Sequence, residues 1–91
     1  MDLIYDSNLQ KNYATITPIK CNFTDTNEST RLYVELTMDN LVSVAVFKYQ
    51  LMDDNLNVYY TDTMAITGID YTNWTGDNTT PFVFIKTKLG L

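Results

Sequence analysis

The feature that most constrains this chain is a run of strict alternation near its middle. In the segment Arg31–Met38 every second residue is apolar, namely Leu32, Val34, Leu36 and Met38. Side chains of a β-strand point alternately to opposite faces of the sheet, so a period of two places these apolar side chains on one face. The segment therefore predicts a half-buried antiparallel strand that needs neighbouring strands to pair with it.

Two following segments supply such neighbours. Leu41–Met52 is apolar on both faces over its first half, which favours a central strand, although period alone leaves a helix open. Its β-branched and aromatic residues and the polar turn Asp53–Asn55 favour the strand. Leu56–Thr67 alternates again and is predicted to pair back as a hairpin. The 14 Thr, 9 Asn and 7 Tyr agree with this interpretation, because Thr and Tyr suit strands and Asn suits turns.

The segments before these strands are less regular. Tyr13–Phe23 alternates moderately, and Pro18, which has no N–H to donate, predicts an edge strand or a strand broken near that residue. A polar turn is expected over Thr24–Thr30. Residues 1–12 have no clear period and are predicted to form an N-terminal arm that lies on a neighbouring surface.

The last segment, Pro81–Leu91, fits two structures. Its aromatic and β-branched residues suit a strand. The alternative is a helix, with Thr80 as N-cap, Pro81 at the first helical position and Gly90 just past the end. We favour the strand and keep the helix as the alternative.

One short helical turn is predicted near residues 69–74, where Tyr71 and Trp74 stand at i and i+3. A chain of 91 residues without repeats or linkers is one domain, residues 1–91. The predicted fold class is therefore mainly β, a small antiparallel sheet or a thin β-sandwich with this helical turn.

The composition excludes most enzyme chemistry. The chain has no histidine and one cysteine, Cys21, so it has no Ser-His or Cys-His pair and no zinc site of the common kinds. It has no phosphate loop or dinucleotide fingerprint, and the adjacent carboxylates Asp53 and Asp54 fit a solvated turn. We expect a protein that is not an enzyme, with no catalytic, cofactor-binding or metal-binding residues.

Charge and hydropathy narrow the range of partners. The net charge of −5 opposes binding to a phosphate backbone, so no nucleic-acid partner is expected. No apolar run approaches the roughly 20 residues of a membrane span, so no membrane partner is expected. Residues 1–6 lack the pattern of a secretory signal, and we expect synthesis in the host cytoplasm.

The remaining function class is protein binding. The apolar residues exceed what one face of a small sheet buries, and Tyr is favoured at interfaces because one end is apolar and the other wet. Trp74, beside a polar loop, is either a partner anchor or a lid on the open end of the sheet. The candidate interface residues are Leu3, Tyr5, Tyr13, Tyr33, Tyr59, Tyr71 and Trp74.

Three segments carry a resemblance to a known class of proteins. Ile66–Asp77, with its Tyr71-x-x-Trp74 followed by Asp77, and the closing Lys88–Leu91 resemble the C-terminal half of small virion proteins of tailed bacteriophages. Asn22–Asp25 is similar to the same type, which occurs in crAss-like and related phages of Bacteroidetes hosts. The resemblance covers about a third of the chain. It implies a β-rich accessory component of a capsid, neck or tail, present in many copies and without catalytic residues.

These observations lead to one main hypothesis and two alternatives. The main hypothesis is a non-enzymatic auxiliary capsid protein of the decoration type, located in the virion, that stabilises the shell through a β-face and its N-terminal arm. Its partners would be other virion proteins, the major capsid protein first, with self-association as a further contact. One alternative is a neck, connector or tail-baseplate component. The other, from a different class, is a carbohydrate- or receptor-binding β-module that uses Trp74.

Overall fold

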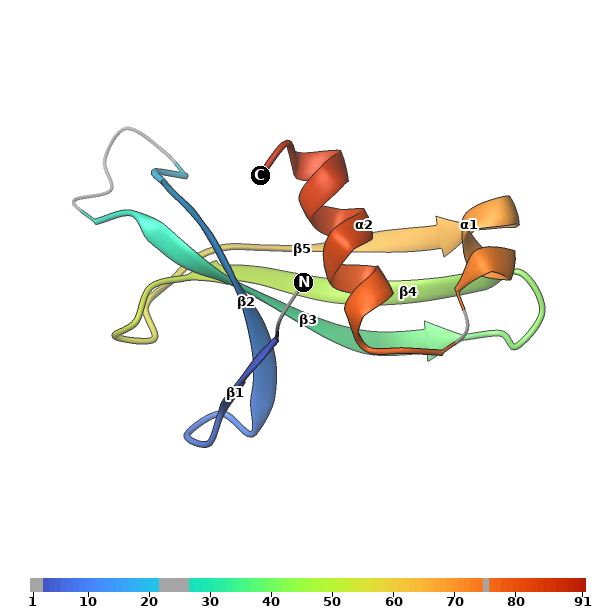
Figure 1. The fold of residues 1–91 in the computed structure, drawn as a ribbon, viewed down its shortest axis with the longest axis horizontal. Helices are drawn as coiled ribbons and strands as arrows, with labels where there is room; N and C mark the ends of the chain where they lie inside the picture. Colours follow the sequence, from blue (N-terminus) through green and yellow to red (C-terminus); the bar gives the residue numbers. More distant parts are fainter. Residues whose placement is uncertain (1–2, 22–26, 75) are drawn as a thin grey trace.

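Five antiparallel strands lie in one sheet in the order in which they occur in the sequence, β1-β2-β3-β4-β5 (Figure 1). The computed structural model describes residues 3–21, 27–74 and 76–91. Within these residues the strands are β1 (Ile4–Asp6), β2 (Lys11–Ile19), β3 (Ser29–Asp39), β4 (Val44–Met52) and β5 (Val58–Thr67). The predicted mainly β class is confirmed, and the strands form one antiparallel sheet with helices on one face in place of a second sheet.

The predicted strands in the middle of the chain are confirmed. β4 pairs with β3 on one side and β5 on the other, which makes it the central strand of the three. Its inward side chains are Ala45, Phe47, Tyr49 and Leu51, and all four are buried. Residues 41–43, which the sequence placed at the start of this strand, lie instead in the β3–β4 turn.

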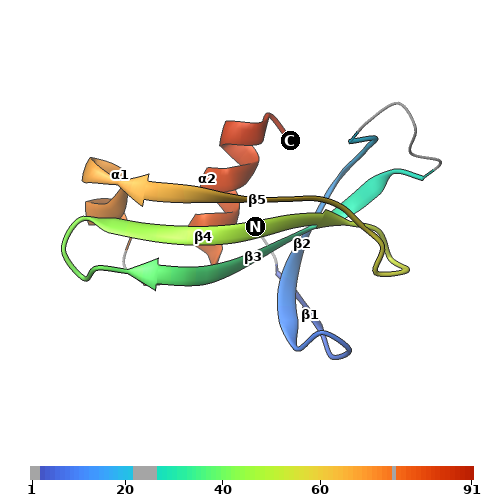
Figure 2. The ribbon, with the colours of Figure 1, turned by 180° about the vertical axis from the view of Figure 1, so that it is seen from behind.

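A helix crosses the apolar face of the sheet. This helix, α2 (Thr79–Leu89), buries Phe82 and Ile85 against the sheet residues, and Leu89 and Leu91 pack at its end (Figures 1 and 2). The buried core shared by the sheet and α2 consists of Ala14, Ile16, Leu32, Ala45, Phe47, Tyr49, Leu51, Ile66, Phe82 and Ile85.

The strand predicted over Pro81–Leu91 is therefore wrong, and the alternative helix is present. Gly90 has φ 72°, which closes the helix in the left-handed conformation, and Leu91 N–H donates to the Lys86 carbonyl. At the other end the predicted cap is displaced: Thr80 lies inside the helix, and its N–H donates to Asp77 Oδ2 at 3.1 Å. Hydrogen bonds from Thr80 lower the pKa of Asp77.

The N-terminal arm is also corrected. Ile4–Asp6 pairs with Lys11–Tyr13 of β2, so this part of residues 1–12 is an edge strand of the protein's own sheet. Leu3 packs against the core, and the hairpin turn is held where Asp6 Oδ1 accepts the N–H of Asn8 at 2.9 Å. Residues 1–2 lie outside the described residues.

Two smaller predictions concern turns. The helical turn predicted near residues 69–74 is confirmed as α1 (Gly68–Asn73). β2 and β3 shift register between Thr15 and Ile19, around Pro18, in agreement with a strand interrupted there. Residues 22–26, which include the first part of the predicted turn and the Asn22–Asp25 segment, lie outside the described residues, and Ser29 and Thr30 at its end belong to β3.

Candidate protein-binding surfaces

Three aliphatic side chains are almost fully exposed at one end of the sheet. Leu41 and Val42, in the β3–β4 turn, are 82% and 79% exposed, and Ile69 in α1 is 75% exposed. The turn and α1 lie at the same end of the molecule (Figures 1 and 2). We call Leu41, Val42 and Ile69 the apolar end. Exposed aliphatic residues that gather in one place mark contact sites more often than scattered ones do.

Polar contacts fix the turn that carries Leu41 and Val42. Asn40 Oδ1 accepts the N–H groups of Val42, Ser43 and Val44 at 2.9–3.0 Å. Asp39 Oδ1 accepts the Leu41 N–H at 2.8 Å and the Tyr71 hydroxyl at 2.7 Å. The hydrogen bond to Asp39 and burial both raise the pKa of Tyr71. The turn is held in one conformation, with its apolar side chains directed outward.

Leu41 also has an unfavourable backbone conformation. Its φ is 62°, in the left-handed region, which costs a residue with a branched side chain about 1–2 kcal/mol. Leu56 has a similar φ of 66°, but its side chain is half-buried against Tyr13, Tyr33 and Met52. Burial thus offsets the strain at Leu56. Leu41 is exposed, so the hydrogen bonds of its turn, and not burial of its side chain, hold this backbone conformation.

A second surface feature is a groove of about 470 Å³ on the helix side of β3. One wall is the β1–β2 hairpin at residues 9–12, and the other consists of Trp74, residues 76–78 and the first turn of α2. The apolar residues that line it are Leu9, Val34, Leu36, Phe47, Trp74, Pro81 and Phe82. The groove lies where β2 separates from β3, because the pairing of these strands ends at Tyr13↔Tyr33 while β3 continues to Asp39.

The structure corrects two of the predicted interface residues. Tyr13 and Tyr33 were expected on an exposed face, but they are 9% and 2% exposed. Their rings are cross-strand neighbours with centroids 5.3 Å apart, and Leu9 and Leu56 cover them. They form a second small core on the face opposite α2, so neither is available as a surface contact.

The other predicted residues are spread over the molecule and do not form one site. Tyr5 is 61% exposed on the edge strand β1, whereas Leu3 is half-buried at the core. The hydroxyl of Tyr59, which is half-buried, donates to Asp53 Oδ2 at 2.8 Å. Tyr71 packs beside Trp74, with ring centroids 5.9 Å apart. That any of these residues contacts a partner remains a prediction.

Trp74 has the contacts of a lid. Its ring packs edge-on against the buried Phe47, with centroids 5.4 Å apart, and its indole N–H donates to the Asp77 carbonyl at 2.9 Å. The polar atom of the ring is thus already used inside the protein. The same ring contributes to the wall of the groove.

Sequence reasoning missed the residues of the apolar end, and it missed the residues of the groove other than Trp74. Leu41 and Val42 follow the polar pair Asp39–Asn40, and their apolar character was interpreted as the start of a strand. The signal that could have separated them is the Asp-Asn pair itself, because both side chains cap backbone N–H groups and so extend the turn by several residues.

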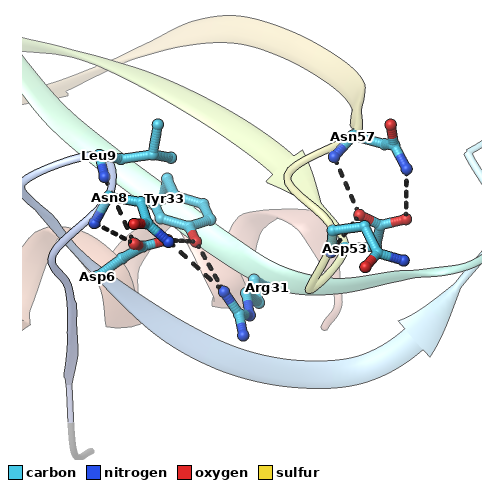
Figure 3. A network of polar contacts seen from close by, with 8 residues as sticks. Asp6, Asn8, Leu9, Arg31, Tyr33, Asp53 and Asn57 are labelled. Carbon is cyan, nitrogen blue, oxygen red and sulfur yellow. Dashed lines mark hydrogen bonds and ion pairs between the residues drawn. The ribbon is translucent and has the colours of Figure 1, made fainter.

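Two buried carboxylates hold loops to the sheet (Figure 3). Asp6 accepts hydrogen bonds from Tyr33 and from Asn8 and Leu9, and it lies 3.6 Å from Arg31. Burial alone would raise its pKa, but the hydrogen bonds and the nearby guanidinium outweigh burial and lower it. At Asp53, burial likewise raises the pKa and the hydrogen bonds lower it. The hydrogen bonds have the larger combined effect, so the pKa of Asp53 is lowered.

These shifts predict a loss of stability in acid. A carboxyl whose pKa is lower in the folded state stabilises the fold above its unfolded pKa of about 4, and this contribution is lost as pH falls through the folded value. We expect the urea midpoint to be constant between about pH 7 and pH 5 and to fall below about pH 4. Urea titrations at several pH values test this, and a midpoint unchanged down to pH 3 would contradict it.

Among the described residues, no group of three His, Cys, Asp or Glu side chains is placed to hold a metal ion. Cys21 is half-buried, and its Sγ lies 3.4 Å from Ser29 Oγ. Neither α1 nor α2, as described, is long and apolar enough to cross a membrane.

No protein-family model, no curated protein and no solved structure matches this chain.

Proposed function

We propose that this protein is a non-enzymatic structural component of a phage particle, an auxiliary capsid protein of the decoration type. It stabilises the shell by binding major capsid subunits through the apolar end, Leu41, Val42 and Ile69. The resemblance of Ile66–Asp77 to small virion proteins supports the assignment to a particle. The apolar end supports the protein-binding role.

The single observation that carries the protein-binding role is the state of Leu41. This residue is 82% exposed and has a φ of 62°, so it combines an exposed apolar side chain with a strained backbone. Residues held in strained backbone conformations cluster at functional sites. A partner would bury the Leu41 side chain, which the hydrogen bonds of the turn to Asp39 and Asn40 already hold outward for that contact.

Replacing Leu41 with glycine separates stability from binding. Glycine adopts positive φ freely, so we expect Leu41→Gly either to leave the free energy of unfolding unchanged or to raise it by up to about 1 kcal/mol. We expect the same substitution to weaken partner binding at least tenfold. Thermal unfolding measures the first effect. Co-sedimentation of the purified protein with assembled capsid shells measures the second.

The matched control is Val83→Ser, on the exposed side of α2, where the side chain is 43% exposed. We expect this variant to bind shells as well as the unmodified protein does. If Leu41→Gly bound equally well, or if the unmodified protein sedimented with neither capsid nor tail subunits, the proposed function would be wrong.

A further inference from the structure

The edge of β3 is open where β2 separates from it. Beyond the pair Tyr13↔Tyr33, Val34–Leu36 and Met38–Asp39 are paired with β4, with a register shift between Leu36 and Met38, and among the described residues no strand pairs with the other side of this stretch. Leu36 and Met38, on this stretch, are 49% and 45% exposed. An unpaired strand edge with exposed apolar side chains is a template for another strand, and proteins usually protect or cover such edges.

The groove beside this edge has the form needed by an extended segment. Its floor is apolar where Val34, Leu36 and Phe47 face α2, and Trp74 and Phe82 close it on the helix side. A strand added beside Val34–Leu36 would direct every second side chain onto this floor, up to the register shift of β3 after Leu36. Its remaining side chains would point to the opposite face of the sheet, toward Glu35.

The charged residues of the groove indicate which charge a bound segment would carry. The charged residues of its lining are Lys11, Glu35 and Asp77. Lys11 Nζ and Glu35 Oε2 form an ion pair at 3.1 Å and neutralise each other, which leaves the exposed carboxylate of Asp77. No Lys or Arg occurs between Lys48 and Lys86 in the sequence, so the lining residues on the helix side of the groove include no cation. An occupant with aliphatic side chains and a basic residue at one end matches this lining.

We propose that this groove binds an extended peptide segment of a partner protein, which adds to β3 as a further strand. Backbone hydrogen bonds to Glu35–Asp39 supply the main attraction, alternate aliphatic side chains fill the floor, and a terminal basic residue pairs with Asp77. This mode of recognition is β-strand addition. It uses a different surface from the apolar end and does not depend on the proposed role in a particle.

The test uses the whole protein and a capped peptide in which valine and threonine alternate, with lysine at each end. Backbone NMR spectra and amide hydrogen exchange are recorded with and without the peptide. We expect shift changes and new exchange protection within Val34–Asp39, together with shifts of the Trp74 indole N–H. Absence of these changes up to the solubility limit of the peptide, or changes confined to other strands, would overturn the proposal.

Three comparisons make the test specific. N-methylation of alternate peptide bonds in the probe removes donors and should abolish binding, and replacing its lysines with glutamates should weaken binding. Leu36→Ser should weaken binding about tenfold, whereas Val58→Ser, at an equally exposed strand position, should not.

The remaining outcomes count against the proposal. Equal binding of the N-methylated peptide would contradict strand addition. If the protein alone were a dimer in which the amides of Val34–Asp39 were already protected, the occupant would be a second copy of this chain. Either result leaves the role of Leu41 in shell binding to its own experiment.

Discussion

Replacing Ile85 with alanine should destabilise the protein by about 2–5 kcal/mol. Ile85 is completely buried between α2 and the sheet, and it belongs to the same core as Leu32, Phe47 and Ile66. The substitution removes apolar contacts and leaves a cavity beneath the helix. A single domain of this size has a total stability of about 5–15 kcal/mol, so the loss is a large part of the total. Urea unfolding followed by far-UV circular dichroism measures it.

The matched control for this prediction lies on the same helix. Val83 is 43% exposed, so Val83→Ala removes little buried surface, and alanine is the better helix former. We expect its stability to remain within about 0.5 kcal/mol of the unmodified protein. If Ile85→Ala had as small an effect as Val83→Ala, α2 would not be docked on the sheet as described.

Replacing Asp53 with alanine should cost about 2–3 kcal/mol. Its buried carboxylate accepts the N–H groups of Asn55 and Asn57, the Asn57 side-chain amide and the Tyr59 hydroxyl, at 2.8–3.1 Å. These bonds close the β4–β5 turn, and alanine removes the acceptor that all of them share. The stability of the variant should also fall less in acid than that of the unmodified protein, because the substitution removes one carboxyl whose pKa is lowered by folding.

The adjacent residue supplies the control. Asp54 has the same charge but is exposed, so Asp54→Ala should change the free energy of unfolding by less than about 0.5 kcal/mol. Urea titrations of both variants at pH 7 and pH 4 make the comparison. Equal losses in the two variants would show that charge, and not the buried hydrogen bonds, stabilises the turn.

The sequence predicted the parts of the fold that depend on a period of two. The alternation places Leu32, Val34 and Leu36 of β3 on the face that α2 covers, opposite the inward residues of β4. Met38 was expected on the same face, but β3 shifts register after Leu36, so Met38 lies opposite Val46 on the other face. The segment Pro81–Leu91 fits a strand and a helix equally by pattern. Phe82 and Phe84 have the spacing of one strand face, and Phe82 and Ile85 have the spacing of one helix face. The local signals at Gly90 and Pro81 gave the correct element, and residue propensity gave the wrong one.

The candidate surfaces could not be predicted in the same way, because they depend on contacts between distant segments. Tyr13 and Tyr33 have the pattern of an outward face, and they are buried because Leu9 and Leu56 reach over them from two turns. The groove exists because β2 leaves β3 after Tyr33, and no residue pattern marks that separation. Exposure at Leu41 follows from a turn conformation that a leucine rarely adopts.

The measurement that tests the central claim most directly is the copy number of this chain in purified phage particles. Quantitative mass spectrometry against the major capsid protein gives the ratio. An auxiliary capsid protein should be present in many copies, in a fixed ratio to the capsid subunit, and should remain with heads after tails are removed. A few copies that separate with the neck or tail would contradict the capsid assignment, and absence from particles would contradict a structural role in the virion altogether.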